Sequence, residues 1–219
     1  AELKGFFQTR GSRRGVLRFW GAQSNGPGGT TLADYLKPAH RARDVSGDAS
    51  LSLGQFLELC LRVGADPWLI VSVSWSEEEW RDLIAYLAGG AVTPFGRQRS
   101  ADRGGVEKPW TAEFGQVFLE SDNETWNGSF HWNFQGREGV RNDAATAYGA
   151  FSELMVQSAK SHPAWAAAGL EGKVRFVVNG WNAQQEEDGY GAMAAKAAPS
   201  AAYADVAPYL GGWEQRSFL

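Results

Sequence analysis

Residues 117–132 read "VFLESDNETWNGSFHW", and this stretch decides how the chain is interpreted. It begins with a short apolar run and passes at once into carboxylates, an amide and aromatic rings. A short, continuously apolar run is typical of a strand that is buried on both faces, as in a parallel sheet. We therefore interpret the stretch as a buried strand that delivers polar side chains to one edge of a sheet.

Similar apolar runs recur along the chain. Including the opening strand, we predict strands at residues 15–20, 67–74, 115–121, 173–180 and, more weakly, 203–209. Helical patterns lie between them, at about 51–64, 76–90 and 142–163, with a weaker one at 185–197. Strands that alternate with helices predict a parallel sheet covered by helices, because parallel neighbours need a crossover connection.

The predicted helices carry local start and stop signals. Ser76 and Glu79 have the spacing of a capping box, and Gly64 is expected to end the helix that precedes it. Asn142 or Asp143 is expected to cap the long third helix, and Pro163 to stop it. The side chains expected to face the core are Leu53, Phe56, Leu57, Cys60, Leu61, Trp80, Leu83, Ile84, Leu87, Tyr148, Phe151, Leu154 and Met155.

Two architectures fit this pattern: an eight-stranded barrel and an open doubly wound sheet. A nucleotide-binding open sheet carries a glycine fingerprint after an early strand. "WGAQSNGPGGTT" at 20–31 matches neither that fingerprint nor the P-loop, so we interpret it as a surface loop, with a nucleotide site as the lesser alternative. Long, polar, glycine-rich loops at 21–50, 89–114 and 125–142, parts of which could hold short helices, are expected to follow the carboxyl ends of the strands, where barrels carry their sites.

Composition and charge exclude several classes of function. The 21 basic and 25 acidic residues give a net charge of -4, and there is no basic stripe to follow phosphates, so we expect no nucleic-acid partner. No apolar stretch approaches the roughly 20 residues that span a bilayer, so we expect no membrane partner. The chain shows no signal peptide, and secretion or a periplasmic location is favoured only for a longer natural protein.

Histidine and cysteine give no sign of a metal or cofactor. His40, His131 and His162 are scattered, and Cys60, the single cysteine, lies in an apolar run as a core thiol. We therefore expect no metal and no cofactor, although the acids of "SDNE" and "DGY" leave calcium open. A serine hydrolase is also disfavoured, because no G-x-S-x-G motif is present.

The polar residues of the opening stretch fit a carbohydrate site. We expect Glu120, Asp122, Asn123 and Glu124 to emerge from the strand end into solvent. A carboxyl group beside tryptophans would be partly desolvated, which raises its pKa and suits a general acid. An amide offers both a donor and an acceptor to a sugar hydroxyl. The alternative is that the carboxylates are solvated loop charges and the tryptophans are packing.

The same residues carry a family resemblance. "ESDNETWN" after a strand resembles the Asn-Glu signature that follows the fourth strand of the clan A glycoside hydrolases. With "GADPWLIVSVS" before it and "VNGWN" and "ADVAPYLGG" after it, the chain from about 15 to 213 most resembles uncharacterised bacterial members near the α-L-arabinofuranosidases. The resemblance implies an α/β fold, a partial (β/α)8 barrel with strands two to six present. It also implies retaining hydrolysis of a plant or bacterial polysaccharide or oligosaccharide.

Residue roles also follow from the resemblance. Glu124 would be the acid/base, and Asn123 would bind the substrate hydroxyl next to the reacting carbon. Arg18 and Tyr209 would orient the nucleophilic carboxylate, although an ordinary ion pair and a packed ring are the alternatives. Further substrate contacts are expected at Trp20, Trp126, Asn127, Trp132, Asn179 and Trp181.

A retaining mechanism also needs a second carboxyl group, about 5 to 5.5 Å from the first. In clan A this is a glutamate that ends the seventh strand. Glu214 lies too close to the sixth strand, and Glu120 is too far from Glu124 along an extended segment. We therefore expect residues 1–219 to be a single incomplete barrel domain, a fragment of a longer chain that hydrolyses little by itself.

Two alternatives remain to a hydrolytic fragment. One is a shortened chain without hydrolytic activity. The other is a carbohydrate-binding protein or pseudoenzyme that grips a polysaccharide through Trp20, Trp126, Trp132 and Trp181. A binding module has little need for an Asn-Glu pair at a strand end, which favours the hydrolase.

Overall fold

The computed structural model describes residues 14–19, 31–37, 51–127, 134 and 136–205. Their strands form one five-stranded sheet in which all neighbours are parallel. The strands are β1 (Val16–Phe19), β2 (Asp66–Val71), β3 (Val117–Ser121), β4 (Val174–Val178) and β5 (Tyr203–Ala204). All five predicted strands are confirmed. The fifth is short, and residues 206–209 of its predicted range lie outside the described residues.

The strand order in the sheet is β1-β2-β3-β4-β5, the same as in the sequence. A doubly wound sheet reverses its order at a switch point, whereas a barrel adds each strand beside the last. The described residues therefore form an α/β fold that matches part of a (β/α)8 barrel, as predicted.

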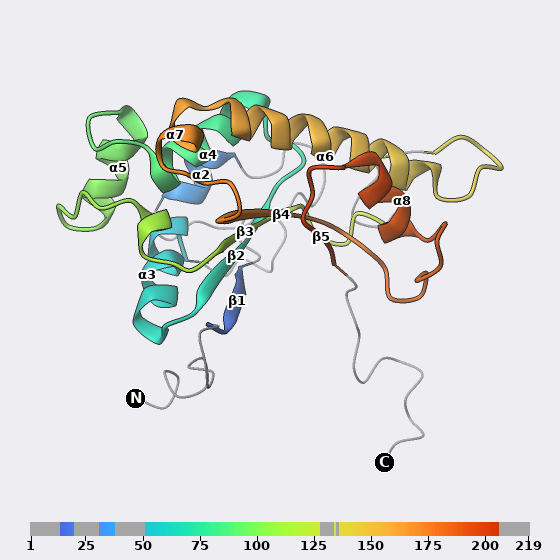
Figure 1. The fold of residues 1–219 in the computed structure, drawn as a ribbon, viewed down its shortest axis with the longest axis horizontal. Coiled ribbons are helices and arrows are strands. Elements are labelled where there is room, and N and C mark those ends of the chain that lie inside the picture. Colours follow the sequence, from blue (N-terminus) through green and yellow to red (C-terminus); the bar gives the residue numbers. More distant parts are fainter. Residues whose placement is uncertain (1–13, 20–30, 38–50, 128–133, 135, 206–219) are drawn as a thin grey trace, which may run out of the picture.

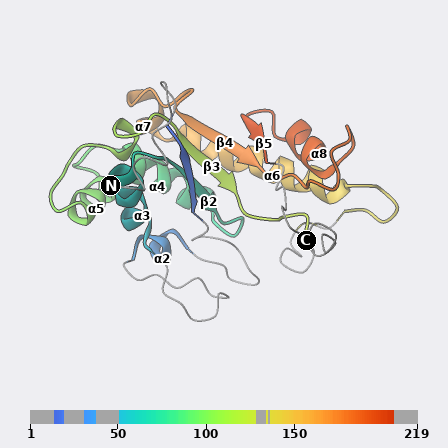
Figure 2. The same cartoon turned by 90° about the horizontal axis from the view of Figure 1, so that it is seen from below.

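Helices connect the strands, and Figure 1 shows α4, α6 and α7 together on one side of the sheet. The helices are α2 (Leu32–Leu36), α3 (Leu53–Val63), α4 (Glu77–Ala88), α5 (Pro94–Asp102), the 3-10 turn η1 (Trp110–Ala112), α6 (Asp143–Ser161), α7 (Pro163–Ala167) and α8 (Tyr190–Ala197). The turned view in Figure 2 shows α8 beside β5, at the opposite end from α5. Within the described ranges no helix is both long and apolar enough to cross a membrane.

The predicted caps are mostly confirmed. Ser76 and Glu79 form the capping box of α4, and Gly64 ends α3 in the left-handed conformation with φ 78°. Asn142 occupies the cap position of α6, but its side chain donates to the carbonyl of Asp188 instead of capping the helix. The helix stops at Ser161, just before Pro163, as predicted.

The core lies between the sheet and the helices that cover it. Most side chains predicted to face inward are buried, including Cys60, whose thiol pKa is raised to about 12 chiefly by burial. The prediction for Leu154 is wrong, because this side chain is 51% exposed. Tyr148, Ser152, Met155 and Ala159 form the buried stripe of α6 at helical spacing, and position 154 lies beside that stripe.

The prediction for residues 89–114 is also wrong. This segment follows α4 and leads into β3, so it meets the sheet at the amino ends of the strands. It contains α5 and η1, and Arg99 of α5 is fully buried with its guanidinium donating to the carbonyls of Tyr86 and Glu107. The weaker helix predicted at 185–197 begins later, at Tyr190.

Candidate active site

Polar side chains converge at the carboxyl ends of β1, β3 and β4. Arg18 lies near the end of β1, Glu120 near the end of β3, and Asn179 directly after β4. The guanidinium of Arg18 donates to both Glu120 and Asn123, so residues that are more than 100 positions apart meet at this edge. The sequence predicted the strand ends correctly, and the parallel sheet brings them together.

Glu120 is the centre of this arrangement, and it is fully buried. Arg18 binds it in a forked pair, from Nε to Oε2 and from Nη2 to Oε1, each at 2.8 Å. The indole Nε1 of Trp68 donates to Oε2 at 2.7 Å, and the amide Nδ2 of Asn179 donates to Oε1. Each carboxylate oxygen of Glu120 therefore accepts hydrogen bonds from two donors.

The prediction that Glu120, Asp122 and Asn123 emerge into solvent is wrong, because Glu120 and Asp122 are fully buried and Asn123 is only 6% exposed. Glu120 is still part of β3, and alternate residues of a strand face the same side of the sheet. Its side chain shares that side with Phe118, whose register neighbours are Trp68 and, one strand further, Arg18. The partners of Glu120 thus come from β1, from β2 and, in Asn179, from the residue after β4, and together they enclose the carboxylate.

Burial in this arrangement raises the pKa of Glu120 to about 7. Arg18 acts in the opposite direction, because its positive charge favours the carboxylate, while the charge of Asp205 adds to the increase. Glu120 is therefore a buried group that titrates near neutral pH.

A pH-dependent stability follows from this pKa. The folded chain holds the Glu120 proton more tightly than the unfolded chain, so the contribution to stability is present below pH 4.5 and is lost as the pH rises to about 7. We expect wild type to lose about 3 kcal/mol of unfolding free energy relative to Glu120→Gln across this window. Urea unfolding of both proteins from pH 4.5 to 7.5 measures the difference, and parallel curves would contradict it.

The turn after β3 has an unusual backbone. Asp122 and Glu124 both adopt positive φ angles, 61° and 49°, although neither is glycine. Asp122 is fully buried, and its carboxylate accepts the backbone N–H groups of Val73 at 3.0 Å and Asn123 at 2.8 Å. Such conformations cost free energy and persist only where the surrounding structure holds them, most often at functional sites.

Asn179 ties this turn to β4. Its Oδ1 accepts the N–H of Thr125 at 3.0 Å, and its Nδ2 donates to the carbonyl of Asp122 at 3.1 Å as well as to Glu120. The buried hydroxyl of Tyr148 lies behind it, donating to the carbonyl of Ser121 and accepting the N–H of Asn179. Asn179 is only 1% exposed, and its predicted contact with a substrate stays a prediction.

Glu124 is half-buried in the turn. Its Oε2 accepts the amide Nδ2 of Asn127 at 3.2 Å, and its carbonyl accepts the N–H of the same residue. Trp126 follows Glu124 by two positions, and Trp181 follows Asn179 by two. Their rings stack on each other, with centroids 5.0 Å apart and an angle of 9° between the ring planes. The acid Glu124 and the amide Asn127 therefore contact each other in the turn after β3, and the indoles of Trp126 and Trp181 pair with each other.

The remaining predicted site residues, Trp20, Trp132 and Tyr209, lie outside the described residues. Sequence reasoning missed Trp68, which looked like strand core, and the hydroxyl of Tyr148, which looked like helix core. Their signal is the polar atom that each ring carries, since buried Trp and Tyr usually pair that atom. In the described part of the chain, no cluster of three or more His, Cys, Asp or Glu side chains could hold a metal ion.

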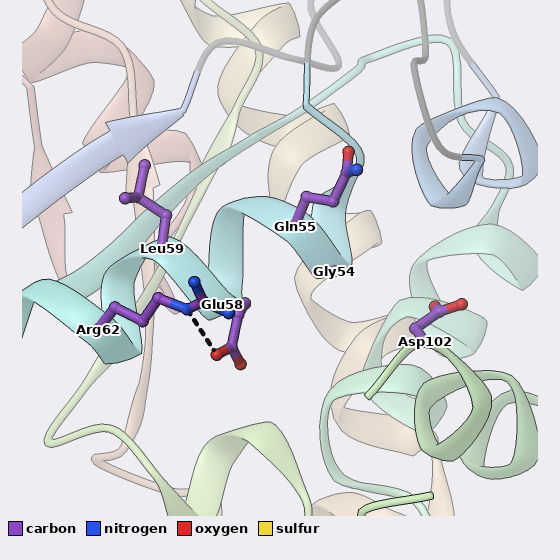
Figure 3. Close-up of a pocket in the computed structure, with 6 residues that line it drawn as sticks. All are labelled: Gly54, Gln55, Glu58, Leu59, Arg62 and Asp102. Carbon is purple, nitrogen blue, oxygen red and sulfur yellow. Dashed lines mark hydrogen bonds and ion pairs between the residues drawn. The ribbon is translucent and has the colours of Figure 1, made fainter. Parts of the chain in front are cut away.

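A pocket of about 300 Å³ lies elsewhere, between α3 and α5 (Figure 3). Its lining residues are Gly54, Gln55, Glu58, Leu59, Arg62 and Asp102. Glu58 and Arg62 pair with each other at 3.0 Å along the exposed face of α3. The pocket shares no residue with the arrangement around Glu120, so it forms no part of the candidate site.

Comparison with known proteins shows which solved structures share this fold. No protein-family model matches the sequence, and no curated protein matches it either. Solved structures do match: a family 51 α-L-arabinofuranosidase from Bifidobacterium longum aligns over 100% of this chain and 39% of its own, with a TM-score of 0.68 and 13% identity.

Two further arabinofuranosidases align less completely, both at 16% identity. The enzyme from Thermotoga maritima, solved as an arabinose complex, aligns over 77% of this chain and 31% of its own, with a TM-score of 0.52. The family 51 enzyme from Xanthomonas axonopodis pv. citri aligns over 82% and 32%, with a TM-score of 0.51. The chain thus has the fold of part of these barrels and spans 31 to 39% of their lengths.

Proposed function

We propose that this chain carries the acid/base half of a retaining glycoside hydrolase site that acts on α-L-arabinofuranosyl groups of a polysaccharide or oligosaccharide. Glu124 is the acid/base, and Asn123 binds the hydroxyl next to the reacting carbon. The observation that carries the proposal is the turn after β3, where Glu124 is held at a positive φ and Asn123 is bound by Arg18. The arabinose sugar is suggested by the neighbours with the same fold.

In this mechanism, Glu124 donates its proton to the glycosidic oxygen while the bond from that oxygen to the sugar carbon breaks. A second carboxylate attacks the same carbon from the opposite face. Glu120 and Asp122 are poor candidates for that role, because both are fully buried and bound by donors. We propose that a part of the barrel beyond the described residues supplies it, in keeping with the greater length of the neighbours.

The pair Trp126–Trp181 favours a second candidate function, carbohydrate binding without cleavage. Both rings are half-buried and stacked, which gives a flat apolar surface of the kind that sugar rings contact. Binding of this kind would need the indoles and would be indifferent to Asn123 and Glu124. The two functions therefore differ in which side chains an oligosaccharide requires.

Calorimetric titration of the 219-residue chain with arabino-oligosaccharides tests the proposal. We expect Asn123→Ala to weaken binding about tenfold, because a hydrogen bond to a sugar hydroxyl is lost. Gln157→Ala, which removes an exposed amide from α6, is the matched control and should leave the affinity unchanged. Absence of binding by wild type would refute the proposal. Binding that depends on Trp181 and ignores Asn123 would favour the non-catalytic function.

A further inference from the structure

We propose that Glu120 is a positioning residue, which sets the orientation of Asn123 and of the turn that carries Glu124. This inference rests on the proposed function, since the groups that Glu120 positions are the proposed substrate-binding and acid/base residues. Glu120 acts through two arms, one formed by Arg18 and one by Asn179.

The first arm fixes the side-chain amide of Asn123. Nη2 of Arg18 donates at 2.8 Å both to Oε1 of Glu120 and to Oδ1 of Asn123. A guanidinium has donors only, so the amide of Asn123 must turn its oxygen toward Arg18 and its NH2 group away. The forked bond to Glu120 holds the guanidinium in the plane from which it makes this contact, because Nε and Nη2 each direct one N–H group at the carboxylate.

The second arm fixes the backbone of the turn. Nδ2 of Asn179 reaches both Glu120 and the carbonyl of Asp122, while Oδ1 receives the N–H of Thr125. Asn179 thus binds the two residues on either side of the Asn123–Glu124 pair. With Glu120 as the acceptor for Nδ2, the amide is held in the one orientation that serves both backbone groups.

The chemistry of Glu120 fits positioning better than a role in stability alone. Replacing a buried ion pair by apolar side chains of similar size is often neutral or stabilising, so stability by itself gives little reason for a fully buried carboxylate. The value of the carboxylate here is geometric. It accepts hydrogen bonds from Arg18 of β1, Trp68 of β2 and Asn179 after β4, and so ties these three parts of the sheet to the turn.

Glu120→Gln tests the inference, with Glu113→Gln as the matched control. Glu113 also accepts two cationic side chains, Arg103 and Lys108, but it lies before β3 and contacts none of the site residues. In Glu120→Gln the new NH2 group faces donors, so one of them must move. We expect the side-chain amide resonances of Asn123 to shift in nitrogen-proton NMR spectra, and the affinity for arabino-oligosaccharides to fall about tenfold; Glu113→Gln should change neither.

Trp68→Phe provides a milder second variant, which removes one donor to Glu120 and keeps a smaller aromatic ring at the position. Trp68→Phe should move the Asn123 resonances in the same direction as Glu120→Gln but by a smaller amount. If Glu120→Gln does not fold, Trp68→Phe alone provides the test. Unchanged Asn123 resonances in a folded variant would overturn the inference. Failure of the proposed function has a different signature: wild type would bind no sugar, while the Asn123 resonances would still respond to Glu120.

Discussion

Arg18→Met is expected to lower the free energy of unfolding by about 3 kcal/mol at pH 8. Methionine keeps most of the apolar part of the Arg18 side chain. It removes the positive charge that pairs with the fully buried carboxylate of Glu120. Trp68 and Asn179 continue to donate to the carboxylate, and the Arg18 side chain is 35% exposed, so the loss should lie at the lower end for a broken buried pair. Urea unfolding followed by circular dichroism measures it.

The control is Arg62→Met, which breaks the pair with Glu58 on the surface of α3. The side chain of Arg62 is 75% exposed, and pairs of this kind contribute less than about 1 kcal/mol. At pH 5 the cost of Arg18→Met should shrink, because Glu120, whose pKa is raised to about 7, is protonated in both proteins. Equal losses of unfolding free energy in Arg18→Met and Arg62→Met at pH 8 would contradict the claim that Arg18 stabilises a buried, charged Glu120.

Much of the fold could be predicted because its signals are local. Ser76 and Glu79 are three positions apart, and Gly64 directly follows α3. Each cap can therefore be predicted from a few neighbouring residues. The strands were legible as continuous apolar runs, and their alternation with helices gave the parallel order. Leu154 was misplaced because a run of apolar residues on α6 is wider than the stripe that packs.

The environment of Glu120 could not be predicted in the same way. Its partners Arg18, Trp68 and Asn179 are 102, 52 and 59 positions away. A glutamate followed by Asp and Asn near a strand end has the composition of a solvated loop. Only the register of three strands shows that the side chain turns toward Trp68 and Arg18 and is closed off from water.

The position of the Asn123–Glu124 pair could be predicted, because a strand end is visible in the sequence, but its backbone could not. The residue types at 122 and 124 do not predict the positive φ angles of Asp122 and Glu124, because glycine, the usual residue in this conformation, is absent there. They depend on bonds from Val73 and Asn179, which reach the turn from β2 and β4. These long-range bonds support the turn that we propose as the site.

Glu124→Gln is the second substitution with a large expected effect, since a positioned general acid contributes about 10²- to 10⁴-fold to a rate. The 219-residue chain is expected to hydrolyse little, so azide can stand in for the second carboxylate. Azide attacks the sugar carbon, the bond to the aglycone oxygen breaks, and Glu124 gives its proton to that oxygen. Glutamine keeps the shape of the side chain but has no such proton to give.

The most direct measurement is therefore the release of methanol from methyl α-L-arabinofuranoside, a poor leaving group that needs the proton, with and without azide, by wild type, Glu124→Gln and the surface control Glu58→Gln. We predict azide-dependent release by wild type and Glu58→Gln, and a rate at least about 10²-fold lower for folded Glu124→Gln. Equal rates for wild type and Glu124→Gln, or no azide-dependent release by wild type, would contradict the assignment of Glu124 as the acid/base.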